Sequence, residues 1–469
     1  MKDIEKHISD RTYFADCSDV AARMNIEIFI VGGYIRDLIL NRQLDDIDIL
    51  VVGDGLEFAK NLANKLGVKN VSFFKNFGTA HFKYQNIDFE FVGARKESYS
   101  EDSRKPSVKV GTFDDDIDRR DFTINTIACS LNKSNYSKII DKYNGIEDIH
   151  NKLIKTPLEP EKTFSDDPLR IMRAFRFASQ LNFKLDDSLF SAASKMADRL
   201  EIISRERITD EFVKIMASSK PSVGIKLLYD SGAMQYVFPE VANLGGVDQR
   251  KDFHHKDVFL HTCQVVDNIA AVSENVWLRF AGLVHDIAKP MTKRFDEKVG
   301  WTFHGHEELG ARMMKHIFRN MKLPFSQLEY IRKLVRLHLR PIALVSDNVT
   351  DSAIRRFIVS IGEDLEDMIL LCRADITSKN PAKVTRYLSN YDMVMEKVRD
   401  VKEKDKLREF QSPVRGAEIM RICNIQPSKK VGQIKNAIEE AILEGEIGNN
   451  YDEALEYLMK IKDQIIISD

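Results

Sequence analysis

The sequence predicts an α+β head followed by an all-helical remainder, and two observations predict this division. Short β-rich runs separated by turns fill roughly the first 145 residues. From about residue 160 onwards, apolar side chains recur with the 3.6-residue period of helices. The chain has 469 residues, which is more than a single hydrophobic core usually serves, so we expect several domains.

Composition and charge indicate a folded chain. With 43% hydrophobic and 30% charged residues, the chain lacks the signature of intrinsic disorder. The net charge of −2 excludes a protein that coats nucleic acid through bulk charge, although it leaves local basic patches open. Five scattered cysteines, a charged N-terminus and the lack of a long apolar run predict a cytoplasmic protein with reduced thiols and no membrane segment. No feature indicates an oligomeric state.

Individual elements of the head follow from local patterns. Strands are expected at five β-rich runs, namely residues 26–31, 47–52, 71–74, 79–84 and 87–92. A helix is expected over residues 55–66, and the whole is predicted to form a sheet of four to six strands.

Breaks rich in Gly, Pro and Ser divide the rest of the chain. We expect four parts, which are a head (1–150), a helical neck (151–245), a middle helical domain (246–380) and a helical tail (381–469).

The segment FIVGGYIRDLILNRQLDDIDILVV (29–52) contains the first candidate site. Gly32 and Gly33 end a strand where a helix begins, so that backbone N–H groups can approach a phosphate. Asp46 and Asp48 lie two apart on the next strand and therefore point to the same face. Their mutual repulsion favours a bound cation, and Mg²⁺ is a cation that carboxylates hold.

A later strand, in the run IDFEFV, offers a third acid. Either Asp88 or Glu90 could complete a three-carboxylate site for two metals, as used in nucleotidyl transfer. Taken alone, the glycine pair and the acid pair also fit a tight turn followed by a solvated strand edge.

The chain resembles the tRNA nucleotidyltransferases, the CCA-adding enzymes whose head is shared with bacterial poly(A) polymerases. The resemblance is carried by four successive segments, VGGYIRDLIL, LDDIDILVV, DRRDFTINTIA (118–128) and SDDPLRIMRAFRF (165–177). It implies an enzyme with a polymerase β-like nucleotidyltransferase head that uses CTP and ATP. The implied reaction is addition of C, C and A to the 3′ acceptor end of tRNA.

The resemblance also assigns roles within the head. It implies that Asp46 and Asp48 bind catalytic Mg²⁺ and that Glu90 is the third acid, which is why we prefer Glu90 to Asp88. One group would form the first triphosphate-binding loop and its support, and it consists of Gly32, Gly33, Arg36 and Asp37. A second group would hold the triphosphate and ribose, and it consists of Arg119, Arg120 and Asp121.

A helix predicted to begin near Asp167 carries Arg170, Arg173 and Arg176 along one stripe, with apolar residues opposite. Spacing alone favours an amphipathic helix with a basic, solvent-facing stripe. The resemblance implies instead that DDPLR selects the base and that Arg173 and Arg176 also belong to the nucleotide-binding site. Asp167 would accept from the amino group of C or A, and Arg170, its neighbour on the helix, would donate to the base. UTP and GTP would set a keto oxygen against the carboxylate, which costs about 1–3 kcal/mol or more.

Two further segments resemble parts of the same enzymes. Residues 95–106 lack an apolar period and resemble the flexible loop of enzymes that add all three nucleotides, with a disordered hairpin tip as the alternative. Residues 203–212 resemble the neck motif that supports the base pocket. There, Arg207 and Glu211 are four residues apart and could pair on one helix face.

Histidines gather in the middle domain, where eight of the 11 in the chain lie between His254 and His338. Six suitable groups occur in the order His261, His285, Asp286, His306, His338 and Asp375. This order resembles the HD superfamily of helical, metal-dependent phosphohydrolases.

The HD resemblance implies a divalent metal of unassigned identity. Its ligands would be His261, His285, Asp286 and Asp375. His306 and His338 would hold a second metal or a substrate phosphate. The alternative is an idle helical module that only positions tRNA.

Several functions remain to be weighed. Within the same class, the alternatives are a poly(A) polymerase or an enzyme that adds only CC or only A. A nucleotide-signalling HD phosphohydrolase or a protein uridylyltransferase is the alternative from another class. The order of head before HD part, the segment at 95–106 and a tail expected to contact tRNA favour CCA addition.

Overall fold

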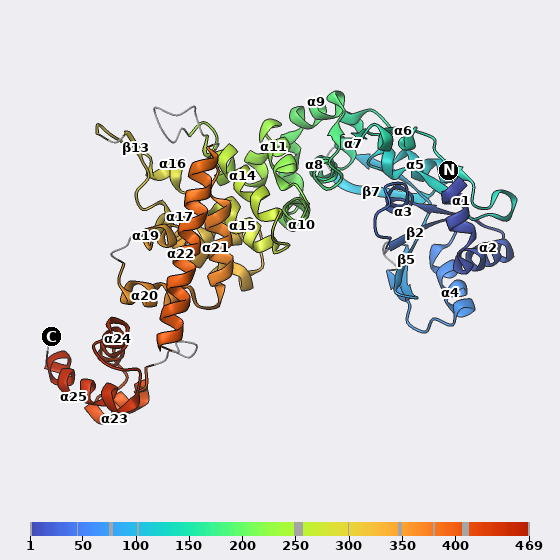
Figure 1. Ribbon diagram of the computed structural model, residues 1–469. Coiled ribbons are helices and arrows are strands. Elements are labelled where there is room, and N and C mark those ends of the chain that lie inside the picture. The colour runs from blue at the N-terminus through green and yellow to red at the C-terminus, as the bar shows by residue number, and fades with distance from the viewer. Residues whose placement is uncertain are drawn as a thin grey trace. The chain divides into compact units, whose positions relative to one another are not determined.

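The computed structural model describes residues 2–44, 46–74, 78–100, 103–247, 257–298, 300–345, 349–378, 380–405 and 412–467. Within this described part, the chain divides into two compact units, Met1–Ala242 and Asn243–Asp469 (Figure 1). The first unit spans the expected head and all but the last three residues of the expected neck, and the second spans those three residues, the expected middle domain and the tail.

A mixed sheet forms the centre of the first unit. Among the described residues its order is β3-β4-β5-β2-β1-β8-β9. The strands are β1 (Glu27–Val31), β2 (Asp46–Val52), β3 (Ser72–Phe74), β4 (Thr79–Tyr84), β5 (Ile87–Gly93), β8 (Ala128–Ser130) and β9 (Ile139–Ile140). All five predicted strands are confirmed, but the expected number of four to six was wrong because this sheet has seven. β8 and β9 are too short to show alternation in the sequence.

Helices of the first unit cover the sheet and form the neck. They are α1 (Lys2–Ser9), α2 (Thr12–Met24), α3 (Gly33–Ile39), α4 (Gly55–Leu66), α5 (Phe113–Asp118), α6 (Gly145–His150), α7 (Pro160–Asp166), α8 (Leu169–Leu181), α9 (Asp187–Lys195), α10 (Arg205–Met216), α11 (Pro221–Asp230), α12 (Met234–Val237) and α13 (Pro239–Ala242). β10 (Leu153–Ile154), which follows α6, pairs in parallel with β11 (Lys184–Leu185), which follows α8.

The helix predicted over residues 55–66 is confirmed as α4. The side chain of Asp54 accepts from the first backbone N–H groups, and Gly67 ends the helix in a left-handed conformation. Phe58 and Leu62 of α4 are fully buried, and the Phe58 ring lies 5.8 Å from that of Phe91 on β5. This apolar face holds α4 on the sheet beside the acid-bearing strands.

The segment expected as a loop at 95–106 forms paired strands instead. β6 (Arg95–Ser100) runs antiparallel to β7 (Ser103–Val110), with Arg95 opposite Val110. Backbone pairing needs no apolar period, which is why the sequence pattern did not indicate it. Gly111 closes the ribbon, because a Cβ at this position would fall 2.5 Å from the carbonyl carbon of Arg95.

The second unit is mainly helical, as predicted. Its helices are α14 (Val258–Ala270), α15 (Val276–Val284), α16 (Lys289–Thr292), α17 (His306–Asn320), α18 (Leu328–Leu337), α19 (Arg340–Ala343), α20 (Asp351–Ile361), α21 (Leu365–Ala374), α22 (Pro381–Asp405), α23 (Gly416–Cys423), α24 (Lys429–Glu444) and α25 (Tyr451–Ile467). A hairpin of β12 (Arg294–Asp296) and β13 (Gly300–Thr302) interrupts the helical pattern between α16 and α17.

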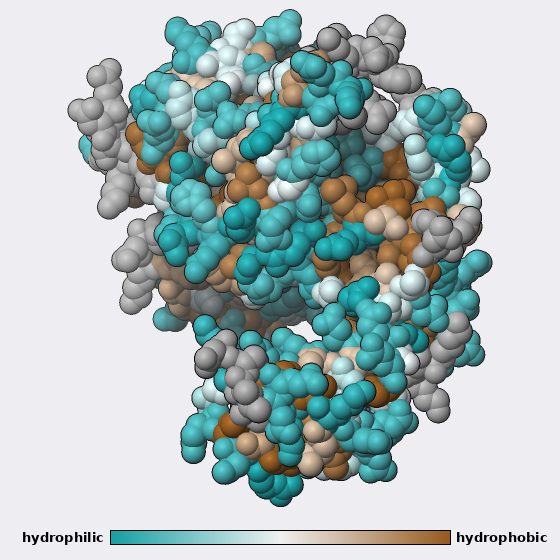
Figure 2. All heavy atoms as spheres, turned by 90° about the vertical axis from the view of Figure 1, so that its left-hand side faces the viewer, coloured by the Kyte–Doolittle hydropathy of each residue, from teal (hydrophilic) through white to brown (hydrophobic). Residues whose placement is uncertain are grey.

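The tail helices α23, α24 and α25 have their own apolar core, which includes Ile419, Ile438 and Leu458. In Figure 2, hydrophilic side chains cover most of the face that is shown, and hydrophobic residues gather in separate patches. Among the described residues, no helix combines the length and the apolar character that crossing a bilayer requires.

Candidate active sites

The acids predicted for the head come together on one face of the sheet. β2 and β5 are parallel, with Asp46 opposite Asp88 and Asp48 opposite Glu90. Because side chains alternate along a strand, all four carboxylates point to the same side. They line a cavity of about 440 Å³, together with Gly33, Arg36 and Asp37 among others.

The two acids of β5 differ in their surroundings. Asp88 lies 2.9 Å from Nε2 of His81 and 3.4 Å from the ammonium of Lys83, both on β4. These neighbours lower the pKa of Asp88. Glu90 stands instead directly beside Asp48 in the strand register. The geometry therefore supports the preference for Glu90 as the third acid.

Asp48 is the most deeply placed carboxylate of this cluster. Burial raises its pKa to about 6, and the charges of Glu90 and Asp46 act in the same direction, while Arg120 and Arg36 oppose them. A carboxylate held among other carboxylates is stabilised when a cation joins them.

Gly32 makes room for this carboxylate. Its φ of +79° lies where residues with a side chain are strained, and a Cβ there would fall 2.7 Å from Oδ2 of Asp48. The glycine pair therefore ends β1 and begins α3 with the backbone pressed against the acid cluster.

The cationic residues predicted for the triphosphate are held by acids. Arg36 donates to both carboxylate oxygens of Asp37 and to Oδ1 of Asn125 at 2.6 Å. Arg119 and Arg120 both pair with Asp116, which is fully buried. Sequence reasoning missed Asp116, although the acidic run at 114–116 just before the two arginines was a visible signal.

The basic stripe of α8 is not exposed to solvent, so that interpretation was wrong. Arg170 and Arg176 are 9% and 8% exposed. Arg173 donates to Asp121 at 2.8 Å, and Arg176 to Glu211 at 2.5 Å. The stripe faces inward because each of these two guanidinium groups has a buried acid to pair with.

Asp121 connects several predicted residues. Its Oδ1 accepts from the backbone N–H of Phe122 and from Asn125, and its Oδ2 accepts from Arg173. Burial alone would raise the pKa of Asp121, but Arg173 and the other donors outweigh it and lower that pKa. Because Asn125 also accepts from Arg36, a continuous polar network links α3 with α8.

One prediction about the base-selecting region was wrong in detail. Asp167 lies in the turn before α8 and not on the helix beside Arg170, since α8 begins after Pro168. Arg170 donates to the carbonyl of Arg119 at 2.5 Å. Asp167 pairs instead with Arg207 of α10 at 3.2 Å.

The expected pair of Arg207 and Glu211 within α10 does not form. Glu211 is 4% exposed and faces α8, where Arg176 reaches its Oε2, while Lys214 of α10 lies 3.6 Å from its Oε1. Arg207 stands at the solvent side of the same helix and turns to Asp167. Because of tertiary packing, Arg207 and Glu211 therefore each pair with a residue outside α10, and not with each other as helical spacing had predicted.

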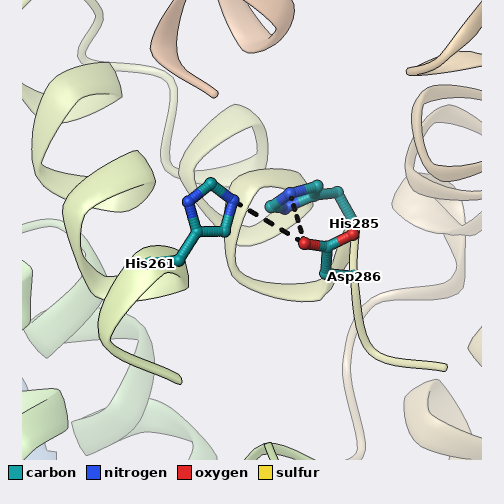
Figure 3. Close-up of side chains that lie close together, drawn as sticks. All are labelled: His261, His285 and Asp286. Carbon is teal, nitrogen blue, oxygen red and sulfur yellow. Dashed lines mark ion pairs between the residues drawn. The ribbon is translucent and has the colours of Figure 1, made fainter. Parts of the chain in front are cut away.

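In the second unit, the predicted histidines and acids converge at the ends of helices (Figure 3). Nε2 of His261 lies 3.6 Å from Oδ2 of Asp286 and 2.9 Å from Oδ1 of Asp375. Nε2 of His285 lies 3.2 Å and 3.4 Å from the same two oxygens. α14, α15 and α21 therefore bring four predicted ligands around one point.

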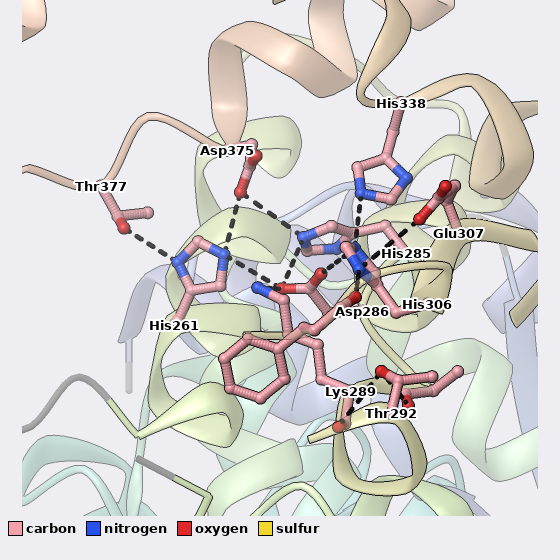
Figure 4. A network of polar contacts seen from close by, with 12 residues as sticks. His261, His285, Asp286, Lys289, Thr292, His306, Glu307, His338, Asp375 and Thr377 are labelled. Atoms are coloured by element: carbon pink, nitrogen blue, oxygen red, sulfur yellow. Dashed lines mark hydrogen bonds and ion pairs between the residues drawn. The ribbon is translucent and has the colours of Figure 1, made fainter. Parts of the chain in front are cut away.

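Each of the four histidines is oriented through its other ring nitrogen (Figure 4). Nδ1 of His285, His306 and His338 donates to the carbonyl three residues earlier in the chain, at 2.7 to 2.8 Å. Nδ1 of His261 lies 2.9 Å from the hydroxyl of Thr377. This arrangement leaves every Nε2 facing inward, which is how metal-binding imidazoles are usually held.

Asp286 is shared by two groups of ligand atoms. Within the described residues, one group is His261, His285 and Asp286, and the other is Asp286, His306 and His338. Oδ1 of Asp286 lies 3.3 Å from Nε2 of His306, so the two carboxylate oxygens face different groups. Lys289, which the predictions did not include, lies 2.6 Å from Oδ2.

These residues fit a divalent metal. Nε2 of His285 and Oδ2 of Asp286 are buried and lie 3.2 Å apart, so one ion can contact both atoms. Burial and the nearby His285 lower the pKa of His338 to about 4, which keeps this imidazole neutral, as a metal ligand must be. At His285 burial opposes protonation, but the carboxylates of Asp286 and Asp375 outweigh it and raise the pKa to about 10, so a metal bound there would displace a proton. Imidazoles and carboxylates together form a donor set that suits a divalent transition metal.

Family models match most of the chain in three segments. Residues 28–155 match the poly(A) polymerase head domain, and residues 182–244 match the probable RNA- and SrmB-binding site of polymerase A. Residues 258–376 match the HD domain.

Curated relatives agree with this assignment. An A-adding tRNA nucleotidyltransferase of Deinococcus radiodurans is 30% identical over 345 residues, which cover 72% of this chain and 76% of that protein. A multifunctional CCA protein of Psychromonas ingrahamii is 31% identical over 64% of this chain and 71% of its own length. An A-adding enzyme of Aquifex aeolicus is 44% identical over 163 residues, but the match spans only 35% of this chain and 19% of that longer protein.

Solved structures show the same fold. A CCA-adding enzyme matches with a TM-score of 0.64 and 20% identity, over 95% of this chain and 93% of that one. A tRNA nucleotidyltransferase complexed with a primer tRNA and an incoming ATP analogue matches with a TM-score of 0.60 and 24% identity, over 82% of this chain and 99% of that one.

The acid-bearing sheet, the neck and the histidine cluster thus define a nucleotidyltransferase with an appended HD domain. The chain belongs to the tRNA nucleotidyltransferase family. Both parts come from metal-dependent enzyme families. The predicted family and fold class are confirmed.

Proposed function

We propose that this chain adds C, C and A to the 3′ end of tRNA from CTP and ATP. The observation that carries the proposal is the alignment of Asp46, Asp48 and Glu90 on neighbouring strands, facing one cavity. When bound there, Mg²⁺ would supply charge stabilisation for attack of the tRNA 3′-hydroxyl and departure of pyrophosphate.

The residues of the chain itself would bind and orient the substrates. Asp46 and Asp48 would hold the metal, with Glu90 beside them. The other side of the cavity carries Gly33 and Arg36, and Arg120 approaches within 3.5 Å of the space beside Gly32. These groups, together with Arg119, would neutralise the triphosphate, while Asp121 has lone pairs left for a ribose hydroxyl.

Base choice would depend on Asp167 and Arg170. Arg207 occupies one oxygen of Asp167, and the Leu169 backbone N–H binds the other at 3.1 Å. Both oxygens keep further lone pairs that can accept the amino group of C or A. A keto group in the same place would meet a fixed carboxylate, which opposes UTP and GTP. Arg173 and Arg176 support this region from α8.

A-only addition is the second candidate, because two of the curated relatives are named A-adding enzymes. Purified protein would be given three tRNAs, which lack CCA, lack CA or lack only the final A. With labelled CTP and ATP, we expect incorporation into all three. Label entering only the last tRNA would show A addition alone, and a long A tract would show poly(A) polymerase activity.

When Mg²⁺ is limiting, the pH dependence of the nucleotide-addition rate should report the protonation of Asp48. Because its folded-state pKa is raised to about 6, Asp48 is a carboxylate above this pH and is protonated below it. At subsaturating Mg²⁺, we expect the addition rate to fall about tenfold per pH unit below about pH 6. Saturating Mg²⁺ should move this fall in the addition rate to lower pH. Because the folded head takes up this proton at a higher pH than the unfolded chain does, the unfolding free energy of the metal-free head should increase as pH falls from about 6 towards 4.

Substitution of Gly32 tests the close approach of backbone and acid. Gly32→Ala should lower the unfolding free energy by about 1–3 kcal/mol and slow nucleotide addition, because the Cβ must displace Asp48. Gly67→Ala is the matched control. Gly67 also has a positive φ, of +72°, but nothing lies within 4 Å of its added Cβ. This variant should lose about 1 kcal/mol and keep its addition rate, and equal rates in both variants would contradict the explanation.

For the second unit, we propose a metal-dependent phosphohydrolase. His261, His285, Asp286 and Asp375 would hold a divalent metal, and His306 and His338 would hold a second one or a phosphate. The convergence of inward-facing Nε2 atoms supports this over an idle module. We further propose the four-part division at 1–150, 151–245, 246–380 and 381–469, a tail that contacts tRNA, and a cytoplasmic location.

A further inference from the structure

The hairpin of β12 and β13 lies in the chain between two candidate ligands, Asp286 and His306. Its side chains are not part of the hydrophobic core, since all three residues of β12 are exposed and those of β13 are half-buried. In Figure 1, α16 and β13 are labelled near one another at one side of the second unit.

Aromatic rings and cations gather on this hairpin. Phe295 is 48% exposed, and its ring lies edge-on to that of Trp301 at 5.1 Å. The ammonium of Lys293 lies 4.4 Å above the Trp301 ring. Arg294 and Lys298 add exposed positive charge. Exposed rings that alternate with cations form a surface on which nucleobases stack while phosphates are neutralised.

Phe303 connects this surface to the metal centre. It follows β13 directly, and its carbonyl accepts from Nδ1 of His306 at 2.7 Å. Lys289 lies 5.6 Å from the centre of the Phe303 ring and 2.6 Å from Asp286. A chain bound along the hairpin would therefore end close to the candidate ligands.

We propose that residues 293–298 and 300–303 form a base-stacking platform that holds the end of a single-stranded RNA and leads its phosphate to the HD centre. The proposal rests on the proposed phosphohydrolase function of that centre. The acids Asp296 and Glu297 lie at the turn of the hairpin, so the phosphates would lie at its base, beside Lys289 and Lys293. An apolar peptide would bring no anion to Lys293 and Arg294, which disfavours a protein occupant.

The chain has two tryptophans, so binding at the hairpin can be measured by tryptophan fluorescence. In a Trp277→Phe background, Trp301 is the single indole, and a base that stacks at the hairpin should quench its emission. A single-stranded RNA trinucleotide is expected to give saturable quenching without added metal. AMP should bind more weakly, and ribose 5-phosphate, which has no base, should have no effect.

Phe295→Ala in the same background should raise the Kd of the trinucleotide about tenfold, through loss of one stacked base. Phe325→Ala is the matched control, because Phe325 is 52% exposed in the same unit but lies beyond the far end of α17, a helix about 22 Å long. Its Kd should not change.

The proposal is overturned if the trinucleotide leaves Trp301 emission unchanged, if Phe295→Ala and Phe325→Ala bind alike, or if AMP or ribose phosphate binds as tightly as the trinucleotide. Metal-dependent hydrolysis of phosphate esters is measured separately. Quenching without any hydrolysis would remove the proposed phosphohydrolase function and leave the RNA-binding platform in place.

Discussion

Asp48→Asn is expected to lower the rate of nucleotide addition by about 10³-fold, which corresponds to about 4 kcal/mol of lost transition-state stabilisation. Asparagine keeps the shape of the side chain but cannot neutralise a cation. The fold should be retained, because the neutral amide relieves the repulsion of Asp48 by Glu90 and Asp46. Label incorporation from CTP and ATP into tRNA that lacks CCA measures the rate, and denaturant unfolding measures stability.

Asp88→Asn is the matched control for this prediction. Asp88 lines the same cavity, but it is paired with His81 and Lys83. Its replacement should change the addition rate by less than tenfold. A rate for Asp88→Asn as low as that of Asp48→Asn would show that the metal site includes Asp88. An active Asp48→Asn protein would exclude the proposed site.

Asp286→Asn is expected to remove metal binding from the second unit altogether. Its two oxygens face different groups of ligands, so a single substitution affects both. Phosphohydrolase activity should fall by about 10³-fold. Nucleotide addition should persist, because the acids of the head are untouched. Isothermal titration with divalent metals and both activity assays measure these effects.

His316→Ala provides the control in the same unit. His316 lies on α17 and contacts Asn320 at 2.7 Å, outside the metal-binding groups. Its replacement should leave metal binding and both activities unchanged. Asp286→Asn leaves Lys289 without its buried partner and should destabilise the second unit by about 3 kcal/mol, so folding is checked by circular dichroism. Loss of nucleotide addition in folded Asp286→Asn protein would contradict independent sites.

The sequence predicted much of both sites because their patterns are local. Strand alternation placed Asp46 and Asp48 on one face, and the order of histidines and acids marked the HD residues. The pairing of Asp48 with Glu90 depends on a parallel register between strands about forty residues apart, and such a register is set by the whole sheet. The β6–β7 ribbon was missed because its polar strands lack the alternation that reveals a half-buried strand.

The sequence by itself determined the fold class, the family and which residue types meet at each site, because these depend on periodicity and on motif order. Only the tertiary structure decided the partners of charged groups. Arg176 pairs with Glu211 and Arg207 with Asp167, since a buried carboxylate pairs with whichever cation packing brings to it. In the same way, only the convergence of separate helices made Asp286 common to two groups of ligands.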